Sequence, residues 1–154
     1  MHEDMNDVKG NVRSNVAICT LWTPAKDIAK KLDKKTFQFA ANFYSGGGIN
    51  ALLRTILAQP TIRYVVLTGA EINNSGDVLM QFFAKGVRKG KVTGTHIYIE
   101  KEIPVKDVER VRKHVQLIDM RGAQAHELKE KVESLHRKKK KAFGAAKQFP
   151  ESEK

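Results

Sequence analysis

A run of small and polar residues, Asn-Phe-Tyr-Ser-Gly-Gly-Gly-Ile-Asn over positions 42–50, stands directly before an apolar repeat. The repeat is formed by Ile49, Leu52, Leu53, Ile56 and Leu57, and its spacing places all five side chains on one face of a helix. Glycines before a helix leave backbone N–H groups free, and the helix dipole favours an anion there. We therefore expect a phosphate or carboxylate to bind at Asn42, Tyr44, Ser45, Gly46, Gly47, Gly48 and Asn50.

A second polar loop follows the short, β-branched run 62–67, which is typical of a strand covered on both faces. Open α/β sheets usually bind ligands at the carboxyl ends of such strands, so this loop is expected to face the glycine loop. Its candidate ligand-binding residues are Gly69, Glu71, Asn73, Asn74 and Ser75. Trp22 ends the first strand on the same side and is expected either to stack on a planar ligand or to cover the core.

Each loop also has a purely structural interpretation. The glycine run lacks the Lys-Ser/Thr ending of a P-loop and the spacing of the dinucleotide fingerprint, so it also fits a flexible hinge. The second loop also fits a polar turn that caps the following helix through Ser75. The sequence is compatible with both interpretations.

The pattern of cysteine and histidine indicates neither a catalytic nor a metal centre. Cys19, the single cysteine, lies inside an apolar run, where a thiol usually behaves as a small hydrophobic group. His96, His114, His126 and His136 are each more than a helical turn from any other histidine or cysteine. We therefore expect no catalytic residue and no metal ligands in this chain.

Predicted strands and helices alternate along the chain. Strands are expected over residues 16–22, 37–41, 62–67, 95–99 and 115–120. Helices are expected between them, and such alternation implies parallel pairing through right-handed crossovers. We predict an α/β, Rossmann-like three-layer fold with a mostly parallel sheet and a basic C-terminal helix.

The expected organisation divides the chain into four parts. Residues 1–13 are polar and without period, which predicts a mobile leader. Residues 14–122 form the Rossmann-like domain, residues 123–143 the basic terminal helix, and residues 144–154 a frayed tail.

Charge suggests an alternative function. The chain has 28 lysines and arginines against 17 acidic residues, a net charge of +11, which favours polyanions through counterion release and steering. The densest basic cluster is Arg137, Lys138, Lys139, Lys140 and Lys141. A nucleic-acid or ribonucleoprotein binding module acting through the C-terminal helix is therefore the alternative. Phe143 is the one aromatic residue near this cluster, so base stacking has little support.

Length and hydropathy indicate the cellular setting. A chain of 154 residues can bury a core as one domain. No apolar stretch approaches the roughly 20 residues of a membrane-spanning helix, and a lone cysteine suits a reducing compartment. We expect a cytoplasmic protein without membrane contact and with an undetermined oligomeric state.

The two loops and the strand between them carry a family resemblance. The residues are Asn42-Phe43-Tyr44-Ser45, the run Leu-Ala-Gln-Pro-Thr-Ile-Arg-Tyr-Val-Val over 57–66, and Gly69-Ala70-Glu71. They resemble the domain appended to archaeal thymidylate synthase-like proteins and, more distantly, the corrinoid-binding A subunit of tetrahydromethanopterin S-methyltransferase. The likeness covers roughly Val16 to Gly122 and implies a Rossmann-like fold.

The resemblance also implies a function in thymidylate or one-carbon metabolism. It suggests a non-catalytic or accessory domain that binds a small anionic ligand, a nucleotide, pterin or corrinoid, beside a synthase or methyltransferase partner. The corrinoid subunit has a histidine, a candidate lower ligand of cobalt, in the loop that corresponds to Glu71 to Gly76, where this chain has none. The cofactor is thus unknown, although a corrinoid can bind without protein ligation. Any enzymatic role would be that of a methyltransferase-related accessory subunit.

Overall fold

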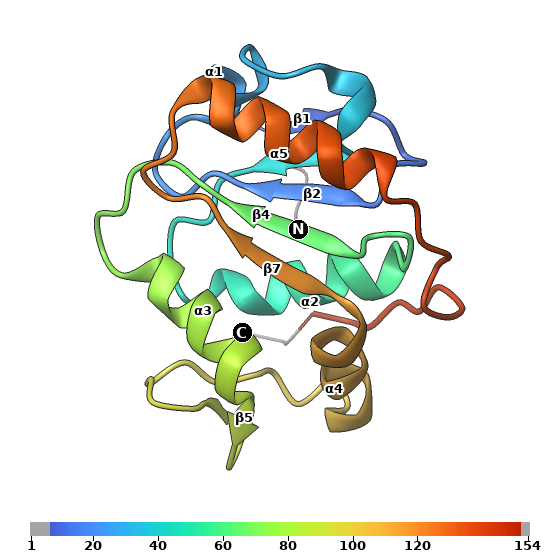
Figure 1. Cartoon of the computed structure of the whole chain (residues 1–154). Coiled ribbons are helices and arrows are strands. Elements are labelled where there is room, and N and C mark those ends of the chain that lie inside the picture. Colours follow the sequence, from blue (N-terminus) through green and yellow to red (C-terminus); the bar gives the residue numbers. More distant parts are fainter. Residues whose placement is uncertain (1–6, 152–154) are drawn as a thin grey trace.

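The computed structural model describes residues 7–151, and its centre is a five-stranded sheet in the order β1-β3-β2-β4-β7 (Figure 1). The strands are β1 (Val8–Lys9), β2 (Val16–Cys19), β3 (Phe39–Ala41), β4 (Tyr64–Leu67) and β7 (Gln116–Asp119). All neighbouring strands are parallel except β1, which runs antiparallel to β3 at one edge. The α/β, mostly parallel, Rossmann-like fold is confirmed.

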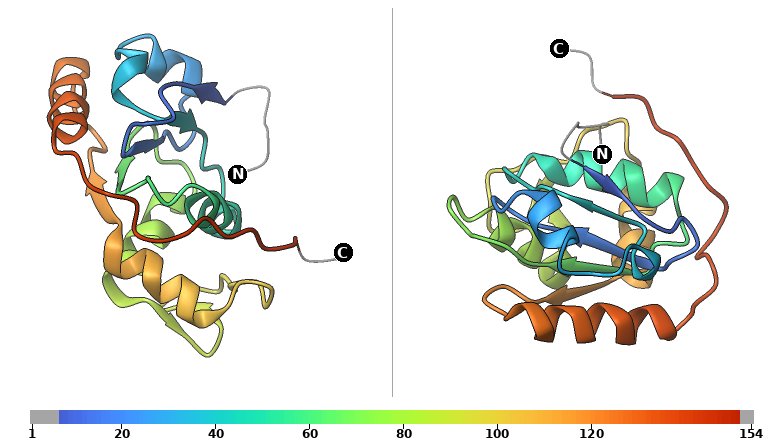
Figure 2. Two further views of the ribbon diagram at one scale, coloured as in Figure 1. Left: turned by 90° about the vertical axis from the view of Figure 1, so that its right-hand side faces the viewer. Right: turned by 90° about the horizontal axis from the view of Figure 1, so that it is seen from above.

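Helices cover both faces of the sheet. They are α1 (Ala25–Ala29), the 3-10 helix η1 (Lys34–Thr36), α2 (Gly48–Ala58), α3 (Ser75–Lys85), α4 (Val105–His114) and α5 (Ala125–Arg137). The helices α1 and α5 lie on one face, and α2, α3 and α4 lie on the other (Figures 1 and 2). The five apolar residues of α2 are all buried, as their spacing predicts.

The chain reverses its winding direction between β2 and β4. It passes from β2 to β3 through α1, then crosses to the opposite side of β2 through α2 and enters β4. Val16 pairs with Tyr64 and Cys19 with Leu67, so the two central strands end side by side. In open α/β sheets the ligand crevice lies at the carboxyl ends of strands that flank such a switch point.

One expected strand is replaced by a hairpin. Residues 95–99 form only an isolated bridge, between Tyr98 and Lys91. The preceding residues form the two-stranded hairpin of β5 (Val87–Arg88) and β6 (Lys91–Val92). Its turn residues Lys89 and Gly90 have φ of 52° and 78°, which suits the tight turn of a two-residue hairpin.

Part of the expected leader belongs to the sheet. Residues 1–6 lie outside the described part of the chain, whereas β1 pairs with β3. The amides of Gly10 and Asn11 then donate to the carbonyls of Gln38 and Phe37, at 2.8 and 2.7 Å. The fold therefore begins before residue 14.

The terminal helix ends at Arg137, earlier than the expected boundary at 143, because the following backbone bonds to the rest of the domain. We call residues 138–151 the C-terminal strap (Figure 2). The carbonyl of Lys138 accepts from the Tyr64 hydroxyl at 3.0 Å, and the amide of Lys140 donates to Asn15 at 2.9 Å. Farther along, the amide of Lys147 donates to the carbonyl of Leu57 at 2.9 Å. Residues 144–151, expected to be frayed, thus make defined contacts.

Asp107, in the first turn of α4, ties this strap to the domain. Its buried carboxylate accepts from Arg110 at 2.9 Å and from Lys147 at 3.2 Å. Burial by itself raises the pKa of this carboxyl, but the hydrogen bonds from Arg110 and Lys147, together with their charges, outweigh it and leave the pKa below its usual value.

Replacement of Asp107 by asparagine should therefore lower stability in a pH-dependent way. Because the folded pKa is depressed, the carboxylate stabilises the fold above its unfolded pKa of about 4, and this contribution is lost as the pH falls through the folded pKa. We expect Asp107→Asn to lose about 1–3 kcal/mol at pH 7 and less at pH 3, measured by urea unfolding. Glu109→Gln removes an exposed carboxylate from the same helix and should cost under about 1 kcal/mol. Equal losses at both pH values would contradict this role.

Candidate functional site at the carboxyl edge

Two exposed aromatic side chains mark the carboxyl edge of the sheet. Trp22 follows β2 and Tyr44 follows β3, and their rings meet edge to face with centroids 5.0 Å apart. Their exposed fractions are 39% and 38%, which is high for large aromatic groups in fixed contact. A pair of partly exposed rings beside a switch point offers apolar surface to a flat ligand.

Asn73 holds the aromatic pair from the next loop. Its side-chain oxygen accepts from the Trp22 indole N–H at 3.2 Å, and its amide donates to the Tyr44 carbonyl at 2.7 Å. The Ser75 hydroxyl also donates to the Tyr44 carbonyl, at 2.9 Å, and contacts Asn73. The structure thus brings the two predicted loops together and includes Trp22 between them.

The glycine loop forms a turn that extends α2 at its amino end. The amides of Gly48, Ile49 and Asn50 donate to carbonyls three residues earlier, at 3.0 to 3.3 Å. These amides are therefore used, in contrast to the expectation that they stay free. The amides of Ser45, Gly46 and Gly47 have no hydrogen-bond partner among residues 7–151, and they are the groups left for an anion.

The three glycines have different surroundings. A Cβ on Gly46 would lie 2.8 Å from Ile97, and one on Gly48 would lie 3.1 Å from the Phe43 ring, so close packing explains both. A Cβ on Gly47 would meet only the Ser45 hydroxyl, at 3.7 Å. Gly47 is therefore the position where a side chain can be added to the loop without disturbing the fold.

Asn42 and Asn50 use their amides inside the protein. The Asn42 amide donates to the carbonyls of Leu21 and Thr23 at 2.8 and 2.7 Å, and its oxygen accepts from the Ala25 amide at 3.2 Å. Asn50 donates to the Tyr98 carbonyl and accepts from the Glu100 amide. Both side chains are buried, so both position loops.

Gly69 permits the central strands to end in contact. With φ of 90° it lies so close to the preceding strand that a Cβ would be 2.0 Å from the Thr20 carbonyl. The amide of Trp22 then donates to the carbonyl of Ala70 at 3.1 Å. Gly69 is thus required for chain passage at the switch point.

Glu71 occupies the amino end of α3. Both carboxylate oxygens accept from the Gly76 amide, at 3.0 and 3.2 Å, where the helix dipole favours negative charge. Asn74 precedes the helix with φ of 62° and makes no side-chain cap. The helix end expected to be capped by Ser75 is capped by Glu71, so this helix already holds an anion.

A charged cluster that sequence reasoning missed lies beside this helix end. Arg121 donates to Asp119 at 2.9 Å and to Asp77 at 3.1 Å. Hydrogen bonding from Arg121 lowers the pKa of the Asp119 carboxyl despite partial burial, and the same pairing raises the pKa of Arg121. Asp77 and Arg121 are 44 residues apart in the chain, so no local sequence pattern indicates that they pair.

Two further properties of the described residues bear on the site. Within 7–151, no three side chains of the histidine, cysteine, aspartate and glutamate types gather as metal ligands would. None of the helices in that range combines the length and apolar character needed to cross a bilayer.

The fold and its edge define a Rossmann-like α/β domain whose loops meet at a switch point. A family model for the A subunit of tetrahydromethanopterin S-methyltransferase matches residues 4–149. The chain belongs to this family. The resemblance to that methyltransferase component is thereby confirmed, while the resemblance to the domain appended to thymidylate synthase-like proteins stays a prediction.

Individual relatives agree with this assignment. The A 2 form of the tetrahydromethanopterin S-methyltransferase A subunit from Methanothermobacter thermautotrophicus is 30% identical over 126 residues, which cover 73% of this chain and 64% of that protein. The A 2 form from Methanobrevibacter ruminantium is 31% identical over 126 residues, covering 73% and 61%. The A subunit from Methanohalobium evestigatum is 28% identical over 105 residues, covering 64% and 43%. The matches thus span 43% to 64% of the length of these relatives.

The two asparagines Asn42 and Asn73 should respond differently to replacement by alanine. Asn42→Ala leaves one buried and one partly buried carbonyl without this donor and should cost about 2–3 kcal/mol, whereas replacement of the exposed Asn73 by alanine should cost less than about 1 kcal/mol. Urea unfolding followed by far-ultraviolet circular dichroism measures both without relying on Trp22. Similar losses in the two variants would show that Asn42 is not the main support of this edge.

Proposed function

We propose that this chain is an accessory, non-catalytic ligand-binding domain that holds a small anionic ligand of one-carbon metabolism at the carboxyl edge of its sheet. The observation that carries the proposal is the exposed Trp22–Tyr44 pair, fixed by Asn73 beside the unpaired amides of residues 45–47. A flat ring would stack on the aromatic pair while a phosphate or carboxylate group bonds to the amides. Nucleotides and pterins combine these two features.

The family supports the metabolic setting. Its members are named as the A subunit of a methyltransferase that acts with tetrahydromethanopterin, a pterin. A methyltransferase partner is therefore the proposed neighbour of this domain, and the cytoplasm its proposed location. A synthase of thymidylate metabolism remains the proposal that follows from the other resemblance.

A corrinoid with cobalt bound by the protein does not fit this edge. The loop from Glu71 to Gly76 has no histidine, and its carboxylate is bonded to the amide of Gly76. A corrinoid in this chain would therefore be held by stacking and hydrogen bonds from the edge residues, without a protein ligand from this loop.

Ligand-induced stabilisation should identify the ligand class. We expect deoxyuridine monophosphate, tetrahydromethanopterin or hydroxocobalamin to raise the melting temperature at moderate salt, because a ligand that binds only the folded state stabilises it. For the ligand that binds, Tyr44→Ala should lower the affinity about tenfold or more, since stacking on one ring contributes roughly 1–3 kcal/mol. Quenching of Trp22, the single tryptophan, measures the affinity of the nucleotide and the pterin. Thermal shifts at graded ligand concentrations measure the affinity for the corrinoid.

Two variants sharpen this test. Tyr98→Ala removes an exposed tyrosine whose ring contacts Lys91, and it should leave the affinity unchanged. Gly47→Val adds a side chain beside the unpaired amides, at a position with room for it. The variant should bind the ligand more weakly while the fold is kept. No stabilisation by any of the three ligands, or equal effects of Tyr44→Ala and Tyr98→Ala, would overturn the proposal.

A second candidate function is binding of nucleic acid through Arg137 to Lys141. One observation favours it: the backbone of this run is fixed through Lys138, Lys140 and Lys141, while all five side chains are exposed. A row of cations on a fixed backbone suits phosphates along a strand.

This alternative predicts a selective charge effect. Lys139→Gln/Lys141→Gln should reduce affinity for a labelled single-stranded oligonucleotide about tenfold at low salt, measured by fluorescence anisotropy. Lys129→Gln/Lys131→Gln removes the same charge from exposed positions of α5 and should have a small effect. Equal loss in both variants would indicate attraction by net charge alone.

A further inference from the structure

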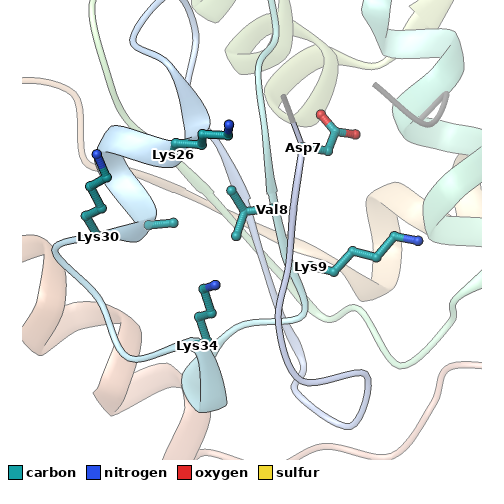
Figure 3. A pocket seen from close by; sticks show the side chains of 7 residues that line it. Asp7, Val8, Lys9, Lys26, Lys30 and Lys34 are labelled. Carbon is teal, nitrogen blue, oxygen red and sulfur yellow. The ribbon is translucent and has the colours of Figure 1, made fainter. Parts of the chain in front are cut away.

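A pocket of about 430 Å³ opens at the β1 edge of the sheet. Lys26 and Lys30, from α1 and its carboxyl end, and Lys34 of η1 line one side, and Asp7 and Lys9 line the other (Figure 3). Val8 and Ala29 complete the lining as apolar wall. The volume lies in the range of about 300–1,000 Å³ that is usual for small-molecule sites.

The pocket is strongly basic. Four lysines and one aspartate line it, which gives a formal charge of +3. Asp7 and Lys9 are each engaged in an interaction of their own. The side chains of Lys26, Lys30 and Lys34 have no hydrogen-bond, ion-pair or ring partner among residues 7–151. The lining therefore brings together three ammonium groups that form no ion pair with a carboxylate of the described chain.

Several cations elsewhere in the domain form ion pairs. Asp107 accepts from two cations, Arg112 pairs with Glu109, and Arg54 pairs with Glu100. The contrast is not explained by a shortage of nearby acids, because Asp27 and Asp33 lie in the same segment. The Asp33 carboxylate instead accepts from the amide of Lys35 and begins η1.

The spacing of these lysines has an energetic cost. Lys26 and Lys30 are four residues apart at the ends of α1, and like charges at this spacing destabilise a helix by a few tenths of a kcal/mol. An anion between them would replace repulsion by attraction. Lysine offers three donors on a flexible stem and binds phosphate or carboxylate oxygens as a point charge.

We propose that this pocket binds a compact polyanion that carries several phosphate or carboxylate groups. The three ammonium groups bind the anionic groups, and Val8 and Ala29 contact the remainder of the molecule. The limited volume favours a small molecule over a nucleic-acid strand. This site is separate from the aromatic pair at the carboxyl edge, so its test is independent of the function proposed above.

The experiment is calorimetric titration of the full chain at low salt with inorganic tripolyphosphate and, in parallel, with citrate. We expect at least one probe to bind and to raise the melting temperature. The double variant Lys30→Gln/Lys34→Gln should bind that probe more weakly, by about tenfold or more. Lys31→Gln/Lys35→Gln makes the same charge change at the same spacing on exposed residues outside the pocket, and it should change the affinity less than about twofold.

The outcomes separate the possibilities. Selective loss in the pocket variant supports the site, and the preferred probe identifies phosphate or carboxylate as the ligand chemistry. Binding of neither probe, or equal weakening in both double variants, overturns it. Unchanged melting temperatures of the unliganded variants confirm that the fold is intact. Tyr44→Ala should leave binding of the probe unchanged, whatever its effect at the carboxyl edge.

Discussion

The side chain of Asn42 is a constraint on the turn that lies between the two candidate sites. At the end of β3, its amide and oxygen make three hydrogen bonds to the turn between β2 and α1. Leu21, within that turn, is buried with φ of 50°, a left-handed conformation that is unfavourable for a bulky residue. The turn exposes Trp22 on one side and begins α1, with its lysines, on the other. A single buried amide therefore holds the turn from which both Trp22 and the start of α1 extend.

The carboxyl edge separates groups that build it from groups that remain available. Asn50, Glu71 and Gly69 are used in loop contacts, a helix cap and a close strand approach. The ring faces of Trp22 and Tyr44 and three backbone amides are left over. These remaining groups are the ones that the proposed ligand would contact. The proposed methyltransferase partner follows from the family that the chain matches.

Periodicity and strand ends made much of this predictable. The apolar spacing of α2 and the buried β-branched run of β4 predicted a parallel sheet. They also predicted that the loops at its carboxyl edge would meet. The sequence did not reveal how each polar side chain is used, since an asparagine that bonds to a ligand and one that bonds to its own backbone have the same local pattern. The pairing of β1 with β3, the hairpin of β5 and β6 and the strap depend on contacts between distant residues or on a turn that periodicity does not detect.

The burial of Cys19 has a consequence for following the folding of this protein. The thiol lies fully buried in β2, which is hydrogen-bonded on both sides, and burial raises its pKa to about 12. An alkylating reagent needs an exposed thiolate, so the native state should be almost inert toward it. Modification then requires the centre of the sheet to open. The rate at which a thiol reagent labels this chain thus reports the cooperative opening of the domain, through its sole cysteine.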